Sequence, residues 1–323
     1  QFFKDLELDE PEYKLEHIKD CKFHGEQTAE MLKGIEKVLM KEKPKVVLVC
    51  GDANFNLAGA LAARKLHMYV GHVESGLRSD DWRMPEEHNR VMIDHISDFL
   101  FAPTEGTAEN ARRDNVKGEI VITGNTIVDA VYQNIKLAEK NSTILSDMNL
   151  KENEYFLLTA HREENVDSQD RLLELYDSLK AIIEKYPDNP IVFPIHPRTE
   201  KRLKQFELKE KFYNTDNLKI IEPLGYVDFL VLLDKAKLVL TDSGGIQEES
   251  CILKTPCVTL RENTERPETA EVGANIITGL KRREVLQGIE EMLQEETDWG
   301  NPFGDGTASE KIIKTVVECL ENE

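Results

Sequence analysis

The sequence predicts an α/β protein made of two doubly wound halves, each with helices on both faces of a parallel sheet. Short apolar runs alternate with amphipathic stretches along the chain, and this βαβ rhythm is typical of parallel sheets. The rhythm pauses once, in the polar segment 140–154, and then restarts. The 323 residues also exceed the ~250–300 at which single cores stop growing. We therefore expect two domains joined near residues 130–155, with a cleft between them.

Each element of the first half has a local signal. Apolar runs predict strands at residues 45–50, 68–74, 98–104 and 119–125. Residues 56–66 show the apolar period of a helix, with about 3.6 residues per turn. Pro85, a residue favoured at the first position of a helix, begins the next one at residues 86–97. A further amphipathic helix at residues 107–115 completes the alternation in this half.

The second half repeats the pattern with longer helices. The predicted strands lie at residues 155–161, 189–197, 218–224, 237–242, 256–261 and 274–279. Amphipathic helices are predicted at residues 168–186, 201–212, 283–296 and 309–322. The last of these follows a glycine-rich turn and ends the chain.

Composition narrows the class of protein. The net charge of −20 argues against nucleic-acid binding, which relies on basic patches, and it means that an anionic ligand must be held by local donors. No run approaches the ~20 apolar residues of a membrane span. The five cysteines are odd in number and form no CxxC pair, which indicates reduced thiols in a cytoplasmic protein.

Nearly every predicted strand ends in a polar or ionisable cluster, and this pattern is the main functional signal. Ligands of such sheets bind at the carboxyl ends of the strands. The clusters include Asp52, Glu74, His161, His196, Asp242 and Arg261. Carboxylates and a histidine at such an edge can transfer protons if burial raises a carboxylate pKa. The turn Ser243-Gly244-Gly245 offers backbone N–H groups and a helix dipole to a phosphate, and the arginines near TERPE can clamp a diphosphate.

Each of these residues also has a structural interpretation, which the sequence alone leaves open. Asp52 fits a helix cap, and Glu74 fits a solvated strand tip. Glu86 and Glu87 fall in a first helical turn, where carboxylates suit the dipole. Either histidine fits a hydrogen-bonded structural role. The sequence has neither a GxxxxGK[ST] loop nor a GxGxxG turn, and its histidines lack zinc-site spacing. No ATP hydrolysis, nicotinamide chemistry, metal or other cofactor is therefore indicated.

Eight segments in order carry a resemblance to a known family: GHVESGLRS, MPEEHNRVMIDHISDFLFAPT, VITGNTIVDA, TAHREEN, VFPIHPRT, LTDSGGIQEES, ENTERPE and NPFGDGTAS. They closely resemble those of non-hydrolysing UDP-N-acetylglucosamine 2-epimerases, and TDSGGIQEE with TERPE at this spacing is highly specific. The resemblance implies two Rossmann-like domains facing a cleft, as in B-type glycosyltransferases, and commonly a homodimer. It implies an N-terminal domain of residues 1–140 plus 306–323 and a C-terminal UDP-binding domain of residues 141–305.

The resemblance also implies an activity and a set of site residues. Family members interconvert UDP-GlcNAc and UDP-ManNAc without a cofactor, by eliminating UDP to give 2-acetamidoglucal and adding it back. Matched position by position, the implied catalytic residues are Asp52, Glu74, Glu86 and His161, the histidine lying near the diphosphate. The implied UDP contacts are Phe229, Ser243, Glu249 and Arg266. The glycines of the phosphate-binding turn, Gly244 and Gly245, are counted with them.

The chain departs from the family pattern at its start. The family begins with a strand followed by GTRPE, and nothing here matches that motif. We expect that an N-terminal βα unit, roughly 40 residues by the length of such units, is missing. A catalytically impaired UDP-sugar binder is therefore one alternative. The others are a hydrolysing 2-epimerase, which releases ManNAc and UDP, and a B-type glycosyltransferase.

Overall fold

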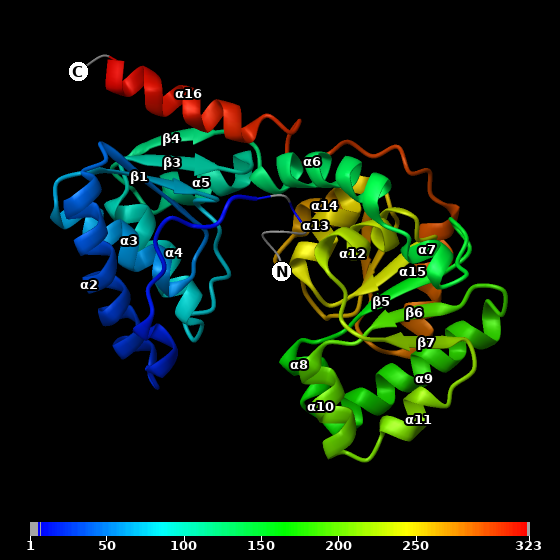
Figure 1. Cartoon of the computed structure of the whole chain (residues 1–323). Coiled ribbons are helices and arrows are strands. Elements are labelled where there is room, and N and C mark those ends of the chain that lie inside the picture. Colours follow the sequence, from blue (N-terminus) through cyan, green and yellow to red (C-terminus); the bar gives the residue numbers. More distant parts are fainter. Residues whose placement is uncertain (1–5, 7, 322–323) are drawn as a thin grey trace. The chain divides into compact units, whose positions relative to one another are not determined.

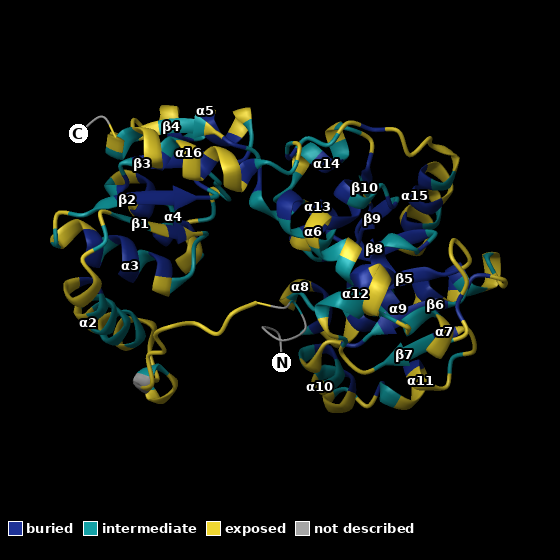
Figure 2. Cartoon of the chain, turned by 45° about the horizontal axis from the view of Figure 1, so that its top comes forward, coloured by how far each residue is buried: buried dark blue, intermediate teal, exposed yellow. Residues whose placement is uncertain are grey.

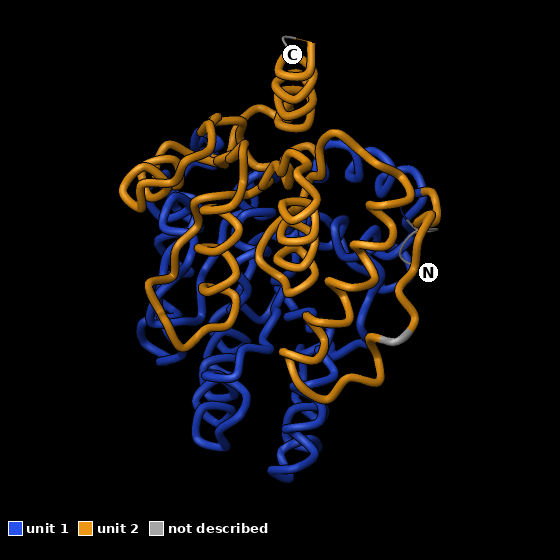
Figure 3. The backbone as a smooth tube through the Cα atoms, turned by 90° about the vertical axis from the view of Figure 1, so that its left-hand side faces the viewer, with its two compact units in different colours: residues 1–8, 130–302 blue, residues 9–129, 303–323 orange. Residues whose placement is uncertain are grey.

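The computed structural model describes residue 6 and residues 8–321, and these residues form two compact units. The N-terminal unit comprises residues 9–129 together with the C-terminal segment from residue 303, and the C-terminal unit comprises residues 130–302 (orange and blue in Figure 3). These boundaries lie close to, but not at, the residues 140 and 306 expected from the sequence. The chain passes from the N-terminal to the C-terminal unit within helix α6 (Thr126–Asn141) and returns between residues 302 and 303.

The N-terminal unit is a parallel sheet of four strands in the order β1-β2-β3-β4 (Figure 1). The strands are β1 (Val46–Cys50), β2 (Tyr69–Val73), β3 (Phe99–Ala102) and β4 (Glu119–Ile122). The helices are η1 (His17–Asp20), α2 (His24–Glu42), α3 (Asn54–Lys65), α4 (Pro85–Ile96), α5 (Glu105–Arg113) and α16 (Ala308–Glu321). Helix α5 begins at a capping box, in which Thr104 accepts the Thr107 N–H group and Thr107 bonds back to the Thr104 backbone.

Apolar side chains cover both faces of this sheet. On one face, Val49 and Val70 pack against residues of α2, α3 and α4. On the other face, Ile312 and Val316 of α16 pack against Phe101 and its neighbours. The C-terminal helix is therefore part of the N-terminal core, although it is the last element of the chain.

Asp129 anchors this returning helix. Its carboxylate accepts the backbone N–H groups of Ala308 at 3.2 Å and Ser309 at 2.8 Å. These are the first N–H groups of α16, which have no partner within the helix. The carboxylate thus satisfies them and matches the positive end of the helix dipole.

The C-terminal unit contains a six-stranded parallel sheet in the order β10-β9-β8-β5-β6-β7. The strands are β5 (Phe156–Thr159), β6 (Ile191–Pro194), β7 (Leu218–Ile221), β8 (Leu238–Thr241), β9 (Cys257–Thr259) and β10 (Asn275–Ile277). The helices are α7 (Ile144–Asp147), α8 (Glu163–Val166), α9 (Gln169–Lys185), α10 (Pro197–Gln205), α11 (Lys209–Tyr213), α12 (Tyr226–Asp234), α13 (Gly244–Leu253), α14 (Pro267–Glu271) and α15 (Arg282–Gln294). The chain winds outward from β5 to β7 and then returns to β8, so the order reverses between β5 and β8.

The two-sheet α/β class expected from the sequence is confirmed, and all ten described strands fall within the predicted apolar runs. The central strands of the C-terminal sheet are almost fully buried (Figure 2), which explains why they read as continuous apolar runs. In the part of the chain that the structure describes, no helix combines the length and apolar character needed to cross a bilayer.

Gly76, in the turn after β2, provides a test of the N-terminal fold. It has a φ of +76°, and a Cβ at this position would lie 2.1 Å from the backbone oxygen of Thr107. We expect Gly76→Ala to lower the free energy of unfolding by about 2–4 kcal/mol, because the clash adds to the left-handed backbone strain. Urea denaturation followed by circular dichroism measures the change.

The matched control for this substitution is Gly25→Ala. A Cβ added to Gly25, in the first turn of α2, meets no atom within 4 Å, so alanine should be neutral or stabilising there. Equal denaturation midpoints for the Gly76 and Gly25 variants would contradict the prediction.

Candidate functional site

The reversal between β5 and β8 brings two of the predicted polar clusters side by side. In doubly wound sheets, ligands bind at such a switch point, outside the carboxyl ends of the strands. Asp242, which follows β8, has no exposed surface. Its carboxylate accepts the backbone N–H groups of His161 at 3.0 and 3.1 Å and of Arg162 at 3.0 Å. Asp242 therefore fixes the loop after β5 against the end of β8.

His161 lies at this junction with part of its ring exposed. Its Nδ1 atom is 3.4 Å from the Asp242 carboxylate, and its ring centre is 5.0 Å from that of His196, which follows β6. Burial lowers the pKa of His161 below its ordinary value, and the effect of His196 acts in the same direction, whereas Asp242 opposes it. At neutral pH the imidazole is therefore mainly uncharged.

The N-terminus of α13 forms an open cradle next to His161. Ser243 occupies the N-cap position, and its side chain makes no capping hydrogen bond to the first turn. A Cβ at Gly244 would lie 3.6 Å from the Glu265 carboxylate, 3.8 Å from Cγ of Arg266 and 4.0 Å from the Arg162 guanidinium, whereas a Cβ at Gly245 would meet no atom within 4 Å. Backbone N–H groups, the helix dipole and the Arg162 guanidinium thus lie together where an anion can approach, beside the Arg266 side chain.

Acidic side chains neutralise the cations of this cradle. Arg266 forms a 2.7 Å ion pair with Glu248, and Arg162 lies 3.4 Å from Glu265. Glu248 is 6% exposed and paired with Arg266. A buried carboxylate needs such a partner.

Glu249, one residue further along α13, is in a different environment. It is also 6% exposed, and its Oε1 atom accepts a 3.0 Å hydrogen bond from the Tyr226 hydroxyl of α12. Burial raises the pKa of Glu249 to about 7, although the bond from Tyr226 acts in the opposite direction. Phe229 lies one turn after Tyr226 on the same helix. Sequence reasoning missed Tyr226, for which the three-residue spacing to Phe229 was the available signal.

In the N-terminal unit, Asp52 follows β1 and is held by α4. Its Oδ2 atom lies 2.9 Å from Nε and 2.7 Å from Nη2 of Arg90, and its carbonyl accepts a 2.8 Å bond from Asn89. Glu74, directly after β2, has a φ of +66°, and its carboxylate lies over Gly51, the residue before Asp52. Two of the predicted carboxylates thus come from adjacent strand ends. Neither Arg90 nor Asn89 was named from the sequence.

The two glutamates that begin α4 have different environments. Glu87 is 2% exposed and accepts hydrogen bonds from the backbone and hydroxyl of Ser79 and from Arg90, at 2.8–3.0 Å. Burial acts to raise the pKa of Glu87, but these hydrogen bonds hold it below its ordinary value. Glu86 is exposed. Of this pair, Glu87 is held by hydrogen bonds within the unit, and the Glu86 side chain remains accessible from solvent.

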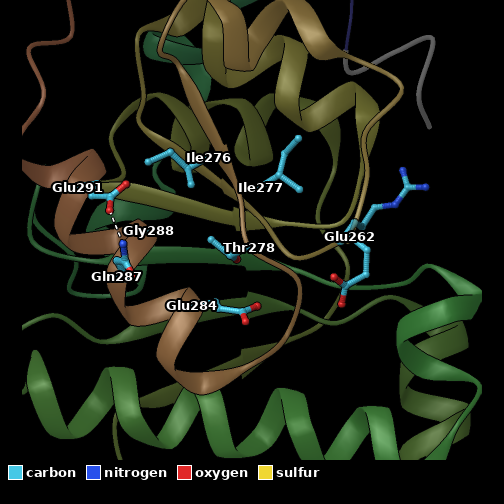
Figure 4. Close-up of a pocket in the computed structure, with 9 residues that line it drawn as sticks. Glu262, Ile276, Ile277, Thr278, Glu284, Gln287, Gly288 and Glu291 are labelled. Atoms are coloured by element: carbon cyan, nitrogen blue, oxygen red, sulfur yellow. Dashed lines mark hydrogen bonds between the residues drawn. The ribbon is translucent and has the colours of Figure 1, made fainter.

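A pocket of about 270 Å³ lies beside β10 and α15 (Figure 4). Glu262, Glu284 and Glu291 contribute three carboxylates to its lining, against the single guanidinium of Arg261. Arg261 belongs to one of the polar clusters named from the sequence, but none of the predicted catalytic or UDP-binding residues lines the pocket. Its acidic lining does not suit a diphosphate.

Comparison with known proteins identifies the family. The model of the UDP-N-acetylglucosamine 2-epimerase family matches residues 1–317. A UDP-N-acetylglucosamine 2-epimerase from Methanocaldococcus jannaschii is 53% identical over 97% of this chain and 86% of its own length. A UDP-2,3-diacetamido-2,3-dideoxy-D-glucuronate 2-epimerase from Pseudomonas aeruginosa is 38% identical over 97% of this chain and 85% of its own length.

Solved structures agree with this assignment. The crystal structure of the Methanocaldococcus jannaschii UDP-GlcNAc 2-epimerase, in complex with UDP-GlcNAc and UDP, superimposes with a TM-score of 0.86. The superposition covers 98% of this chain and 87% of that chain. The order of motifs, the parallel sheets and the extent of these matches lead to one conclusion: the chain belongs to the UDP-N-acetylglucosamine 2-epimerase family.

Proposed function

We propose that this chain interconverts UDP-GlcNAc and UDP-ManNAc as a non-hydrolysing epimerase. The observation that carries the proposal is the cradle at α13. Its N-terminus, Arg162 and Arg266 suit a diphosphate, and Glu249 lies about 7–8 Å further along the helix axis, a distance that suits a ribose. The 53% identical relative, which is named for this activity, supports the same assignment.

The proposed reaction balances without a redox cofactor. A base removes the proton from C2 while the bond between C1 and the UDP oxygen breaks, giving 2-acetamidoglucal and UDP. An acid then delivers a proton to the opposite face of C2, and the UDP oxygen attacks C1. The chemistry requires two proton-transferring groups and a firmly held leaving group.

The proposal assigns the leaving group to the C-terminal unit. Ser243, Gly244 and Gly245 direct backbone N–H groups at the diphosphate, and Arg266 supplies charge. His161, uncharged near pH 7, donates a hydrogen bond to the same group as negative charge develops on it. Glu249 accepts from the ribose hydroxyls, and Phe229 contacts the uracil.

The proton transfers are assigned to Asp52, Glu74 and Glu86 of the N-terminal unit. The Arg90 contacts hold the Asp52 side chain in place. Glu74 lies beside it over Gly51. The Glu86 side chain is exposed and forms no hydrogen bond or ion pair with the residues that the structure describes, so its carboxyl group is accessible to a substrate.

We also propose that the protein works as a cytoplasmic homodimer. The family resemblance supports the dimer, with the helix-rich N-terminal unit as the proposed interface, and the five free cysteines are consistent with a reducing compartment.

Proton NMR in deuterated buffer tests the reaction and its alternatives together. Incubating the chain with UDP-GlcNAc should produce UDP-ManNAc that carries deuterium at C2. Release of free ManNAc would instead indicate a hydrolysing enzyme. Binding of UDP without deuterium incorporation would indicate a non-catalytic binder. A UDP-2,3-diacetamido sugar, the substrate class in the name of the 38% identical relative, serves as the specificity control.

Glu86→Gln tests the assignment of the proton-transferring groups. We expect deuterium exchange at C2 to fall by ~10²–10⁴-fold, the usual loss for an acid–base residue, while UDP affinity stays within about threefold. Exchange rates and calorimetric titration with UDP measure the two effects. Glu109→Gln, at an exposed glutamate of α5, is the control and should exchange normally. Normal exchange by the Glu86 variant would remove Glu86 from the mechanism.

The pKa of Glu249, about 7, predicts a pH dependence for UDP binding. Ribose hydroxyls donate to the ionised carboxylate, so binding should tighten as pH rises through 7 and level off above pH ~8. Between pH 8 and pH 6 the affinity should fall by up to ~10-fold, in line with the ionised fraction. Glu249→Gln should remove the part of the pH dependence that comes from Glu249 and keep the part that comes from the ionisation of UDP itself. The UDP affinities of the unmodified chain and the variant are measured by calorimetry across this pH range. An equal change of affinity with pH in both would contradict the prediction.

A further inference from the structure

A buried ionic network lies beneath the carboxyl ends of β1 and β2. Its centre is Asp94 of α4, which has no exposed surface. The Oδ1 atom lies 2.6 Å from Nδ1 of His72. The Oδ2 atom accepts a 2.6 Å bond from Nη2 of Arg78 and a 3.2 Å bond from the Gly76 backbone. Asp94 therefore receives three donors from two segments.

His72 extends the network to a third segment. The ring is fully buried in β2, and its Nε2 atom is 3.1 Å from the carbonyl oxygen of Gly51. Both ring nitrogens thus face oxygen atoms. Burial acts to raise the pKa of Asp94, but the contacts from His72 and Arg78 hold it below its ordinary value. The network is a buried carboxylate held between an imidazole and a guanidinium.

Each branch of the network ends on a segment that carries one of the proposed proton-transferring groups. Gly51 directly precedes Asp52. Gly76 comes two residues after Glu74. Asp94 itself lies about two turns after Glu86 on the same helix.

Both glycines have a φ of +76°, a conformation that favours glycine, and Gly76 abuts the backbone of Thr107. Asp94 therefore connects helix α4 directly to the turn after β2 and, through His72, to the end of β1.

Stability alone does not account for such an arrangement. Burying charges is costly, and a well-packed apolar replacement is often as stable as a buried ion pair. What the network provides is a fixed relation among three backbone segments. We infer that Asp94, His72 and Arg78 are positioning residues that hold Asp52, Glu74 and Glu86 in their reactive arrangement. This inference rests on the proposed function.

The test uses His72→Gln and Asp94→Asn in the full chain, with deuterium exchange at C2 as the readout. We expect the rate at saturating UDP-GlcNAc to fall at least tenfold, because small misplacements of reacting groups are costly. KM and UDP affinity should stay within about threefold, since the nucleotide contacts lie in the other unit. Rates are expressed per folded protein, measured by circular dichroism. His72→Gln carries the test by itself if Asp94→Asn does not fold.

The matched control is Asp98→Asn. Asp98 also combines an arginine contact with a backbone contact, to Arg64 at 2.8 Å and the Val70 N–H group at 2.9 Å. It lies at the amino end of β2, away from the proposed carboxylates. We expect Asp98→Asn to lower stability and to leave the exchange rate per folded protein within about twofold.

A double-mutant cycle separates positioning from general loss of structure. If His72 acts through the position of Asp52, His72→Gln should cause at most a twofold further loss in an Asp52→Asn background. Independent losses multiply, and a product of the two single effects would overturn the inference. Full exchange rates for both His72→Gln and Asp94→Asn would also overturn it. Absence of exchange in the unmodified chain would overturn the proposed function instead.

Discussion

The carboxylate of Asp242 is the contact on which the nucleotide half of the candidate site depends. It has no exposed surface, and it bonds the backbone of His161 and Arg162 at the point where the strand order reverses. These bonds add to the pairing of β5 with β8 and fix the loop after β5 against the N-terminus of α13. The cradle, with its guanidiniums and its neutral imidazole, exists because one buried anion holds two strand ends together.

The N-terminal unit uses the same device. Asp94, like Asp242, is fully buried and accepts backbone N–H groups from a strand-end turn. In both units a buried carboxylate organises segments that carry other polar groups. This arrangement suits parallel sheets, whose strand ends are close in space but are joined only through long crossovers.

Paired glutamates show how neighbouring residues of one type take different roles. In α4, Glu87 is bound by Arg90 while Glu86 stays exposed. In α13, Glu248 is paired with Arg266, whereas Glu249 is raised in pKa by burial. In each pair an arginine forms an ion pair with one carboxylate and holds it in place. The second carboxylate has no arginine partner in the described part of the chain and is the one proposed to bind the substrate or exchange protons. A protein with a negative net charge can bind an anion in this way, because nearby hydrogen-bond donors attract the anion more strongly than the net charge repels it.

The sequence by itself determined the strands, several of the helices, the family and the identity of the polar strand ends. These follow from local periodicity and from motifs read in order, so they need no knowledge of distant contacts. Only the tertiary structure decided that α16 is anchored by Asp129, 180 residues earlier in the chain, and that Asp242 reaches back 81 residues to His161. It also decided which glutamate of each pair is locked in place, that Tyr226 bonds Glu249, and that Asp94 contacts His72, Arg78 and Gly76. Such roles arise from burial and from partners far apart in the chain, and the local pattern of a single sequence carries neither.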